Sequence, residues 1–254
     1  MRGSGIALAI LVILTSAALV YRRANTAIEM QWVQYESGVD SVRAFVALPQ
    51  GQGPFPAIIV FHEWWGLNEW VKSKARALAG QGYLAMAVDL YRGEVTADAS
   101  HAHELMRGVP EDRAIRDLKS AFAYLSSRSD VKSSKIGSIG WCMGGGYSLQ
   151  TAVHVPGLAA CVINYGKLVT DEELLAGINA PLLGIFGAQD RGIPVKSVKA
   201  FEASCRKLNK AVEMHVFSNS GHAFMNENNQ KSYNGKDAVE AWQESLAFFE
   251  KHLK

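Results

Sequence analysis

The sequence of 254 residues has little cysteine and almost no excess charge. Its three cysteines are too few, and odd in number, for a disulfide framework, so at least one thiol is free or pairs with another molecule. Lys and Arg total 26 against 24 Asp and Glu, which leaves a formal net charge of +2. Without a basic stripe or a block of like charge, the sequence argues against a nucleic-acid-binding protein.

Internal repeats, low-complexity tracts and proline-rich linkers are also missing from the main part of the chain. The cysteines and histidines do not show the spacing of zinc ligands. His101 and His103 are two positions apart in a predicted helix, so they do not share a face and do not form a metal pair. We therefore expect no metal site. Hydrophobic residues make up 48% of the chain, and a chain of this length forms a sizeable core without disulfide help.

One long hydrophobic run is present, from Gly5 to Tyr21, and it contains no charged residue. The run is at the short end of what crosses a bilayer, for which about 20 residues are needed. Small residues at positions 16–18 also suit the end of a signal peptide. Arginines stand on both sides of the run, so the distribution of positive charge does not fix its orientation.

Two interpretations of this run remain open, an uncleaved membrane anchor and a cleaved signal. In both, residues 1–27 form the anchor or signal segment with a short linker, and residues 28–254 form the main domain. We expect a membrane-anchored or exported, extracytoplasmic domain, with an anchored domain on the cytosolic side as the alternative. Free thiols suit a reducing compartment, which conflicts with export.

Strand-like and helix-like segments alternate along the main domain. The sequence predicts strands over residues 30–36, 41–49, 56–62, 83–91, 135–140, 158–166, 181–190 and 211–218. It predicts helices over residues 69–82, 99–108, 111–128, 144–155, 195–209 and 235–254. This alternation is typical of an α/β fold, a mostly parallel sheet with helices on both faces. In such sheets ligands bind at the carboxyl ends of the strands, so candidate site residues are sought there.

The first candidate is the segment Gly140-Trp141-Cys142-Met143-Gly144, which joins a predicted strand to a predicted helix. Gly-x-Cys-x-Gly in this context has the form of a nucleophile elbow, a sharp turn that exposes its middle side chain above the sheet. The N–H of Met143 would point at an oxyanion, and the helix N-terminus favours a thiolate on Cys142. The alternative is a glycine-rich packing turn with an inert, buried cysteine.

Two more candidates follow later strands. Asp190 lies in the loop "GAQDRG" after one strand, and His222 lies in "SGHAF" after the next. Each alone could be an ordinary loop residue. Together with Cys142 they follow the order nucleophile, acid, histidine that is typical of α/β-hydrolases. This order predicts a catalytic triad in which His222 shuttles protons and Asp190 orients the imidazole.

The loop "HEWWG" after the strand 56–62 is the fourth candidate. In an α/β-hydrolase this loop supplies the second N–H of the oxyanion hole, and Trp64 is our candidate for that N–H. Glu63 places a carboxylate in an aromatic setting, where loss of water would raise its pKa. Alternatively, Glu63 is a surface residue and Trp64 and Trp65 are simply part of the core.

These motifs resemble the dienelactone hydrolase family of α/β-hydrolases over nearly the whole main domain, from about residue 28 to 253. The resemblance rests on Glu63 in "HEWWG", on "DLY" at 89–91, on "GWCMGG" at 140–145, on Asp190 in "GAQD" and on "GHAF" at 221–224. It implies hydrolysis of an ester or lactone through an acyl-enzyme, without metal or cofactor. It also implies that Glu63 partners the Cys142 thiol.

The resemblance further implies contacts to the substrate from Tyr91, Arg92 and Trp65. In the family, two arginines hold a carboxylate of the lactone, and Arg92 is a near match to one of them. Met225 and Asn226 stand where the second would lie, so the clamp is incomplete and dienelactone itself is not expected as the substrate.

Other functions are compatible with these residues. A thioesterase or an acyl transferase would use the same triad, and a non-catalytic, membrane-anchored binding module would normally have lost part of it. A thiol redox sensor would need Cys161 or Cys205 close to Cys142. The expected partner is a small ester or lactone, and no nucleic acid is expected to bind. A membrane contact would come only through an uncleaved N-terminal segment. We expect the protein to be a monomer.

Overall fold

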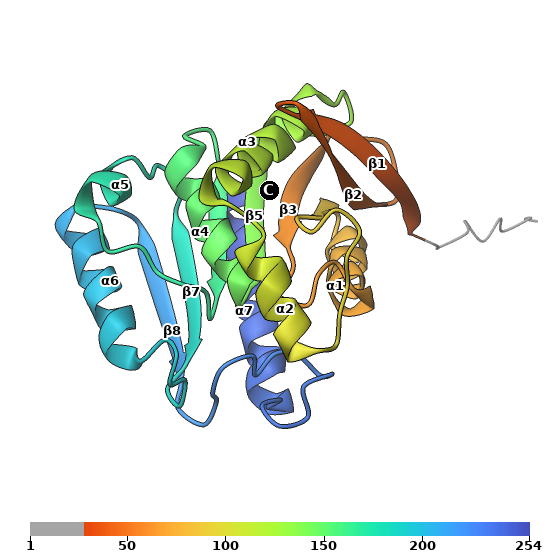
Figure 1. The fold of residues 1–254 in the computed structure, drawn as a ribbon. Coiled ribbons are helices and arrows are strands. Elements are labelled where there is room, and N and C mark those ends of the chain that lie inside the picture. The colour runs from red at the N-terminus through yellow and green to blue at the C-terminus, as the bar shows by residue number, and fades with distance from the viewer. Residues whose placement is uncertain (1–27) are drawn as a thin grey trace, which may run out of the picture.

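The structure, a computed structural model, describes residues 28–254 and is built around an eight-stranded sheet (Figure 1). The strand order is β1-β2-β4-β3-β5-β6-β7-β8. The strands are β1 (Glu29–Ser37), β2 (Asp40–Leu48), β3 (Phe55–Phe61), β4 (Leu84–Val88), β5 (Val131–Trp141), β6 (Ala160–Asn164), β7 (Leu182–Gly187) and β8 (Val212–Phe217).

The sheet is antiparallel only at its β1–β2 edge. β1 pairs with β2 and β2 with β4 in antiparallel register, whereas every later pair is parallel. The hairpin turns at Gly38, whose φ of +65° lies in the left-handed region that glycine enters without strain. Parallel strands from β3 to β8 bring their carboxyl ends to one edge, which is the edge expected to carry function.

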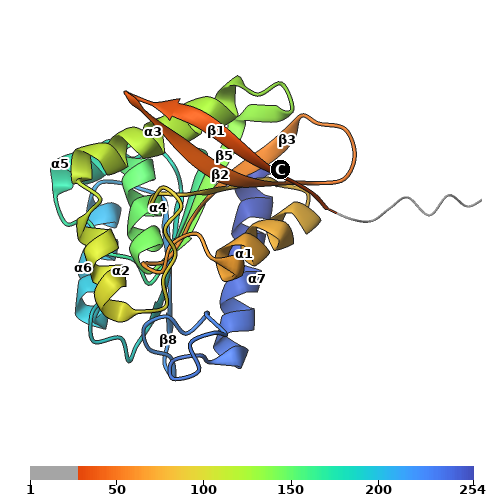
Figure 2. The same cartoon turned by 45° about the vertical axis from the view of Figure 1, so that its right-hand side comes forward.

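Helices cover both faces of the sheet, as the sequence predicts (Figure 2). One face carries α1 and α7, and the other carries α3, α4 and α6. The helices are α1 (Glu69–Gly80), α2 (Ala99–Arg107), α3 (Glu111–Ser127), α4 (Met143–His154), α5 (Glu172–Ala176), α6 (Val195–Lys207) and α7 (Gly235–Leu253).

The core alternates between the two faces along each central strand. On β3, Ile58 and Val60 pack with α1, whereas Ile59 and Phe61 pack with α3 on the opposite side. The strands β4 and β6 are buried along their whole length. Their continuous hydrophobic runs are therefore explained by helices on both faces.

The α/β-hydrolase fold is thus confirmed, and the differences from the predicted elements are local. The helix α5 was not predicted because five residues are too few to show a helical period. The strand β5 begins at Val131, four positions before the predicted start at residue 135, because polar residues occupy its first half.

The predicted hydrophobic helix from Gly5 to Tyr21 lies outside the described residues. Within residues 28–254, no helix is long and apolar enough to cross a membrane.

Candidate active site

Cys142 lies directly after β5 and forms the N-cap of α4. Its φ of +54° and ψ of −117° place a residue with a Cβ in a region that such residues rarely adopt. The side chain is partly exposed, and the thiol is free. This geometry is that of a strained turn that presents its middle side chain at the edge of the sheet, as the Gly-x-Cys-x-Gly motif predicts.

The flanking glycines make this turn possible because backbone atoms crowd both positions. A Cβ on Gly140 would collide with the carbonyl oxygen of Gly144, and a Cβ on Gly144 would collide with that of Phe61. The first turn of α4 therefore lies directly against β5 and β3. Any larger residue at either position would displace Cys142.

Asn164, at the end of β6, holds the elbow from the neighbouring strand. Its carbonyl oxygen accepts the N–H of Cys142 at 3.0 Å, and its side-chain Nδ2 donates to the carbonyl of Gly140 at 3.0 Å. The side chain is fully buried. Sequence reasoning missed this residue, because a single asparagine at a strand end carries no motif.

Asp190 and His222 meet as the sequence predicts, although they are 32 residues apart. Nδ1 of His222 lies 2.7 Å from Oδ2 of Asp190. Oδ1 of the same carboxylate accepts the N–H groups of Gly192 at 2.8 Å and Ile193 at 3.0 Å. Burial acts to raise the pKa of Asp190, but these hydrogen bonds outweigh it, so the pKa falls below its usual value.

His222 also faces the thiol. Burial acts to lower its pKa, but hydrogen bonds with Asp190 and Cys142 outweigh burial and raise the pKa to about 10. Tyr165 packs against the imidazole, with the two ring centroids 5.3 Å apart. The structure therefore brings Cys142, Asp190 and His222 to one edge of the sheet, with the imidazole between the thiol and the carboxylate.

Glu63 is buried beside this group, with 2% of its surface exposed. Oε2 accepts a hydrogen bond from Nδ2 of Asn226 at 2.5 Å, whereas Oε1 is buried and has no partner in the described part of the chain. Burial raises the pKa of Glu63 to about 7, although the Asn226 amide and the nearby His222 act against it. Glu63 forms no hydrogen bond with Cys142 among residues 28–254, so its predicted pairing with the thiol stays a prediction.

His62 fixes the backbone that carries Glu63. Its Nδ1 donates to the carbonyl of Glu63 at 2.6 Å, and its Nε2 accepts the N–H of Leu90 at 3.3 Å. Burial lowers the pKa of His62 to about 4, so the ring is neutral near pH 7 and carries its proton on Nδ1. His62 thereby ties the loop after β3 to the end of β4, a role that its place in the sequence did not reveal.

In the described part of the chain, the N–H groups of both predicted oxyanion donors are without a hydrogen-bond acceptor. Across residues 28–254, neither the N–H of Trp64 nor that of Met143 donates to a protein acceptor. The side chain of Trp64 packs against Trp65, with centroids 4.6 Å apart, and against His103 at 4.8 Å. Trp64 and Trp65 are both half-buried. These aromatic contacts fix the loop without using the Trp64 N–H.

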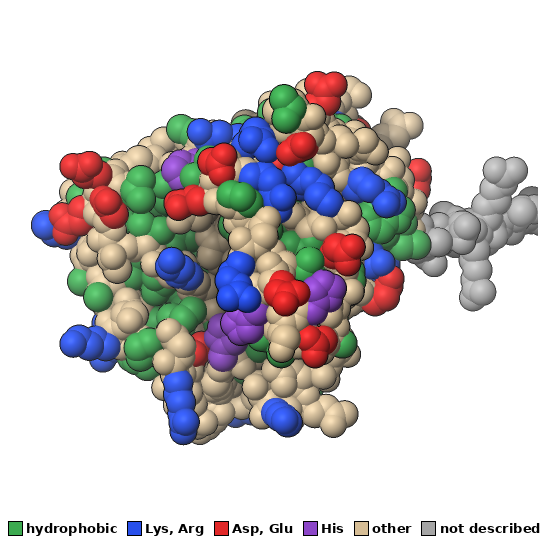
Figure 3. All heavy atoms as spheres, viewed as in Figure 1, with side chains coloured by type: hydrophobic (Ala, Val, Ile, Leu, Met, Phe, Trp, Pro, Cys, Tyr) green, Lys and Arg blue, Asp and Glu red, His purple; other side chains and the backbone are tan. Residues whose placement is uncertain are grey.

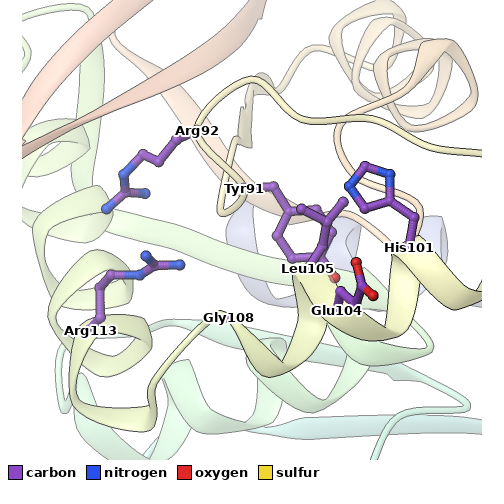
Figure 4. Close-up of a pocket in the computed structure, with 7 residues that line it drawn as sticks. All are labelled: Tyr91, Arg92, His101, Glu104, Leu105, Gly108 and Arg113. Carbon is purple, nitrogen blue, oxygen red and sulfur yellow. The ribbon is translucent and has the colours of Figure 1, made fainter.

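Tyr91 lies between the elbow and a cavity of about 390 Å³ (Figure 4). Its hydroxyl lies 3.2 Å from Sδ of Met143. Arg92 and Arg113 also line this cavity, and their side chains lie along the same side of it. The cavity therefore borders the elbow through Tyr91 and carries two cationic groups.

Arg92 forms an ion pair with a buried carboxylate of the protein. Its Nη2 lies 2.8 Å from the carboxylate of Asp117, whose side chain is fully buried. The hydroxyl of Ser37 donates to the same carboxylate at 2.5 Å. The guanidinium therefore balances a buried charge that joins α3 to β1, and the contact of Arg92 with substrate stays a prediction.

The other two thiols are buried in the core. Burial raises the pKa of Cys161 and of Cys205 to about 11 in each case. In the described ranges, no group of three His, Cys, Asp or Glu side chains could hold a metal ion.

Comparison with known proteins places this geometry in context. Residues 42–253 match the dienelactone hydrolase family. A candidate carboxymethylenebutenolidase from Escherichia coli (strain K12) is 32% identical over 251 residues, which cover 93% of this chain and 92% of that protein. A candidate 2-oxo-3-(5-oxofuran-2-ylidene)propanoate lactonase from Bradyrhizobium sp is 30% identical over 243 residues, which cover 91% of this chain and 97% of that protein.

Two solved structures have the same fold as this chain. The crystal structure of a candidate dienelactone hydrolase from Klebsiella pneumoniae subsp. pneumoniae superposes with a TM-score of 0.81 at 31% identity, covering 89% of this chain and 100% of that chain. A dienelactone hydrolase-like promiscuous phosphotriesterase from metagenomic libraries gives a TM-score of 0.84 at 24% identity, and the match covers 90% of this chain and 100% of that chain. The second likeness concerns the fold alone.

Proposed function

Because the chain belongs to the dienelactone hydrolase family and is a hydrolase of esters or lactones, we propose that it works through an acyl-enzyme on Cys142. The observation that carries this proposal is the 2.7 Å contact between His222 and Asp190 beside a cysteine held at a φ of +54°. A histidine that is oriented by a carboxylate and faces a strained, partly exposed nucleophile is the arrangement of a catalytic triad.

In the first half of the reaction, Cys142 passes its thiol proton to His222, whose raised pKa favours an imidazolium beside a thiolate, and Sγ then attacks the carbonyl carbon of the substrate. The N–H groups of Trp64 and Met143 stabilise the negative charge that develops on the carbonyl oxygen. The tetrahedral intermediate then collapses, the bond from carbon to the leaving oxygen breaks, and His222 gives its proton to that oxygen. Asp190 holds Nδ1 of the imidazole throughout, so that Nε2 is the atom that moves the proton.

In the second half, a water molecule attacks the acyl carbon and His222 accepts its proton. The bond from carbon to sulfur breaks, the carboxylic acid leaves, and the proton returns to the thiol. No step needs a metal ion or a redox cofactor, because the attacking atom, the base and the oxyanion donors all belong to the chain.

Glu63 sets the state of the resting thiol. A carboxylate close to a thiol disfavours the thiolate by repulsion of like charges. With a pKa of about 7, Glu63 can hold or release a proton near neutral pH. Substrate would displace Glu63 or let it take up the thiol proton and pass it to His222. The resting thiol would resist peroxide, because oxidation starts from the thiolate.

The proposed substrate is an ester or lactone without a strictly required carboxylate. The Bradyrhizobium relative is a candidate lactonase for an acid-bearing lactone. In this chain, however, the guanidinium of Arg92 already pairs with Asp117, and Asn226 hydrogen-bonds to Glu63. These commitments favour a neutral substrate over an anionic one.

The direct test is an activity screen with p-nitrophenyl acetate and short acyl thioesters, using the wild-type protein and Cys142→Ala. We expect the variant to lose turnover of every substrate that the wild type cleaves. Cys205→Ala, which removes a buried thiol of the core, serves as the matched control and should keep its activity. Turnover by Cys142→Ala at the wild-type rate would overturn the acyl-enzyme proposal.

We also propose that the domain is exported, either tethered or released, on the strength of the hydrophobic run from Gly5 to Tyr21. Protease added to intact cells should then digest the domain once an outer barrier is opened. Protection of the domain until the cytosol is released would reverse this assignment.

A further inference from the structure

A groove of about 630 Å³ runs between α3 and α4. One face of α3 and one face of α4 form its walls, and the lining residues have the same spacing in both helices. From α3 they are Glu111, Ala114, Ile115 and Leu118, and from α4 they are Met143, Gly146, Tyr147 and Gln150. Residues spaced by three, four and seven positions share one helix face, so the groove follows both helices for two turns, or roughly 10 Å.

The lining of the groove is mainly apolar. Leu168, Val169 and Leu174 close its outer side from the segment that follows β6. At Gly146 the wall has no side chain, and the backbone of Lys167 lies 3.4 Å from where a Cβ would be. Figure 3 views this side of the molecule, where apolar side chains lie among charged ones over α4 and α5. Volumes of 300–1,000 Å³ with apolar walls are typical of small-molecule sites.

One end of the groove lies next to Cys142 in the sequence, at the first residue of α4. Met143, the residue after Cys142, lines it, and the N–H of Met143 is a predicted oxyanion donor. The N–H of Gly146, also in the lining, donates to the carbonyl of Cys142 at 3.3 Å. An acyl group attached to the sulfur would therefore enter the groove at its Met143 end.

The triad indicates which part of a substrate enters the groove. His222 must lie next to the leaving oxygen, because it gives that oxygen a proton. His222 and Asp190 line a different, polar cavity of about 970 Å³, together with Arg191 and Lys231. The leaving group therefore lies on the His222 side, and the acyl chain lies on the α3–α4 side.

We propose that the α3–α4 groove is an acyl-chain site, and that the preferred substrates are esters or thioesters of medium-length, unbranched carboxylic acids. This inference rests on the proposed function, since it assumes an acyl-enzyme on Cys142. Gln150 is a polar lining residue two turns along α4 from Met143 and would contact the far end of a chain that fills the groove. The preference should consequently stop rising once the chain reaches it.

The test compares two series of esters. In p-nitrophenyl esters the acyl chain grows from acetate through butanoate and hexanoate to octanoate, and in alkyl acetates the alcohol grows from methyl to hexyl. We expect kcat/KM to rise up to about fourfold for each added methylene of the acyl series until the groove is full. The alcohol series should stay nearly flat.

Ile115→Trp fills the groove and should lower the ratio of hexanoate to acetate kcat/KM by at least tenfold. Leu174→Asp places a charge at its partly exposed rim and should lower the same ratio, even if Ile115→Trp does not fold. Val239→Trp, at an exposed apolar position of α7, is the matched control and should leave the ratio unchanged.

A flat acyl series, or ratios that neither groove variant changes, would overturn the acyl-chain site while Cys142-dependent hydrolysis still supports the proposed function. A steep alcohol series with a flat acyl series would assign the groove to the leaving group instead, which also contradicts the inference. Hydrolysis that survives Cys142→Ala would be a failure of the proposed function itself.

Discussion

The two acidic residues of the reaction centre differ in how well their environments stabilise a charge. Asp190 accepts hydrogen bonds from His222, Gly192 and Ile193, and its pKa is lowered. Glu63 accepts one from Asn226, leaves Oε1 without a partner in the described structure, and has its pKa raised by burial to about 7. The fold thus stabilises an ionised Asp190 and penalises an ionised Glu63, so a charged Glu63 lowers the stability of the folded protein.

The difference also predicts opposite responses to pH. Asp190 has a folded pKa below its unfolded value, so its contribution to stability is present above the unfolded pKa and is lost as the pH falls through the folded pKa. Glu63 has a folded pKa above its unfolded value of about 4.5, so stability falls as the pH rises from there to about 7.

The largest effect should follow from removing the imidazole that Asp190 orients. His222→Ala should lower kcat by roughly 10²–10⁴, because the thiol loses its base and the leaving group loses its acid. Asp190→Asn should also lower kcat, since the amide no longer holds the imidazole as a charged partner. Steady-state kinetics on p-nitrophenyl acetate measure both, and a His222→Ala variant with nearly wild-type kcat would remove His222 from the triad.

Arg92→Ala should give the next largest effect, and mainly on stability. It leaves the buried carboxylate of Asp117 without its cation, and breaking such a pair destabilises by about 3–5 kcal/mol. Urea denaturation measures the loss, with Arg92→Lys as the charge-keeping control. The rise in KM should be the same for an acid-bearing and a neutral ester. A rise confined to the acid-bearing ester would show that Arg92 binds the carboxylate of the substrate.

Glu63→Gln should stabilise the protein at high pH. The amide keeps the shape of the side chain and removes the penalty of a buried charge, which is at most about 3 kcal/mol from the raised pKa. The gain should be present at pH 8 and nearly vanish at pH 4.5, where Glu63 is protonated in the folded protein. Urea denaturation at the two pH values measures it, and an equal gain at both would mean that charge is not the cause.

The same variant separates a functional Glu63 from a bystander. We expect slower acylation in single-turnover experiments, because the amide cannot take up the thiol proton. We also expect faster inactivation of the free enzyme by peroxide, because the thiolate is no longer repelled. Asn226→Ala, which keeps the carboxylate and removes its hydrogen-bond donor, should change the pH dependence of both rates. Unchanged rates in Glu63→Gln would leave Glu63 without a role in the reaction.

The parts of the site that sequence predicted are those in which local geometry demands particular residues. The elbow needs Gly140 and Gly144, and the acid and histidine must follow later strands in order, so the pattern is visible in the chain itself. The buried strands were visible for the same reason, because helices on both faces require continuous hydrophobic runs.

The parts of the site that the sequence did not predict depend on contacts between distant segments. Asn226 lies 163 positions from Glu63, and Arg92, in the loop after β4, meets Asp117 of α3 across 25 positions. His62 stood next to a recognised motif, yet its hydrogen bonds to Glu63 and Leu90 follow from the pairing of β3 with β4. No spacing rule encodes such contacts, so only the folded chain reveals them.

The most direct test of the account is to trap the acyl-enzyme. Wild-type protein is mixed with excess p-nitrophenyl acetate, quenched in acid within the first turnovers and digested for mass spectrometry. We expect one acetyl group on the peptide that contains Cys142, none on the peptides that contain Cys161 and Cys205, and none on the corresponding peptide of Cys142→Ala. Continued turnover with no adduct, or an adduct on another residue, would contradict the account.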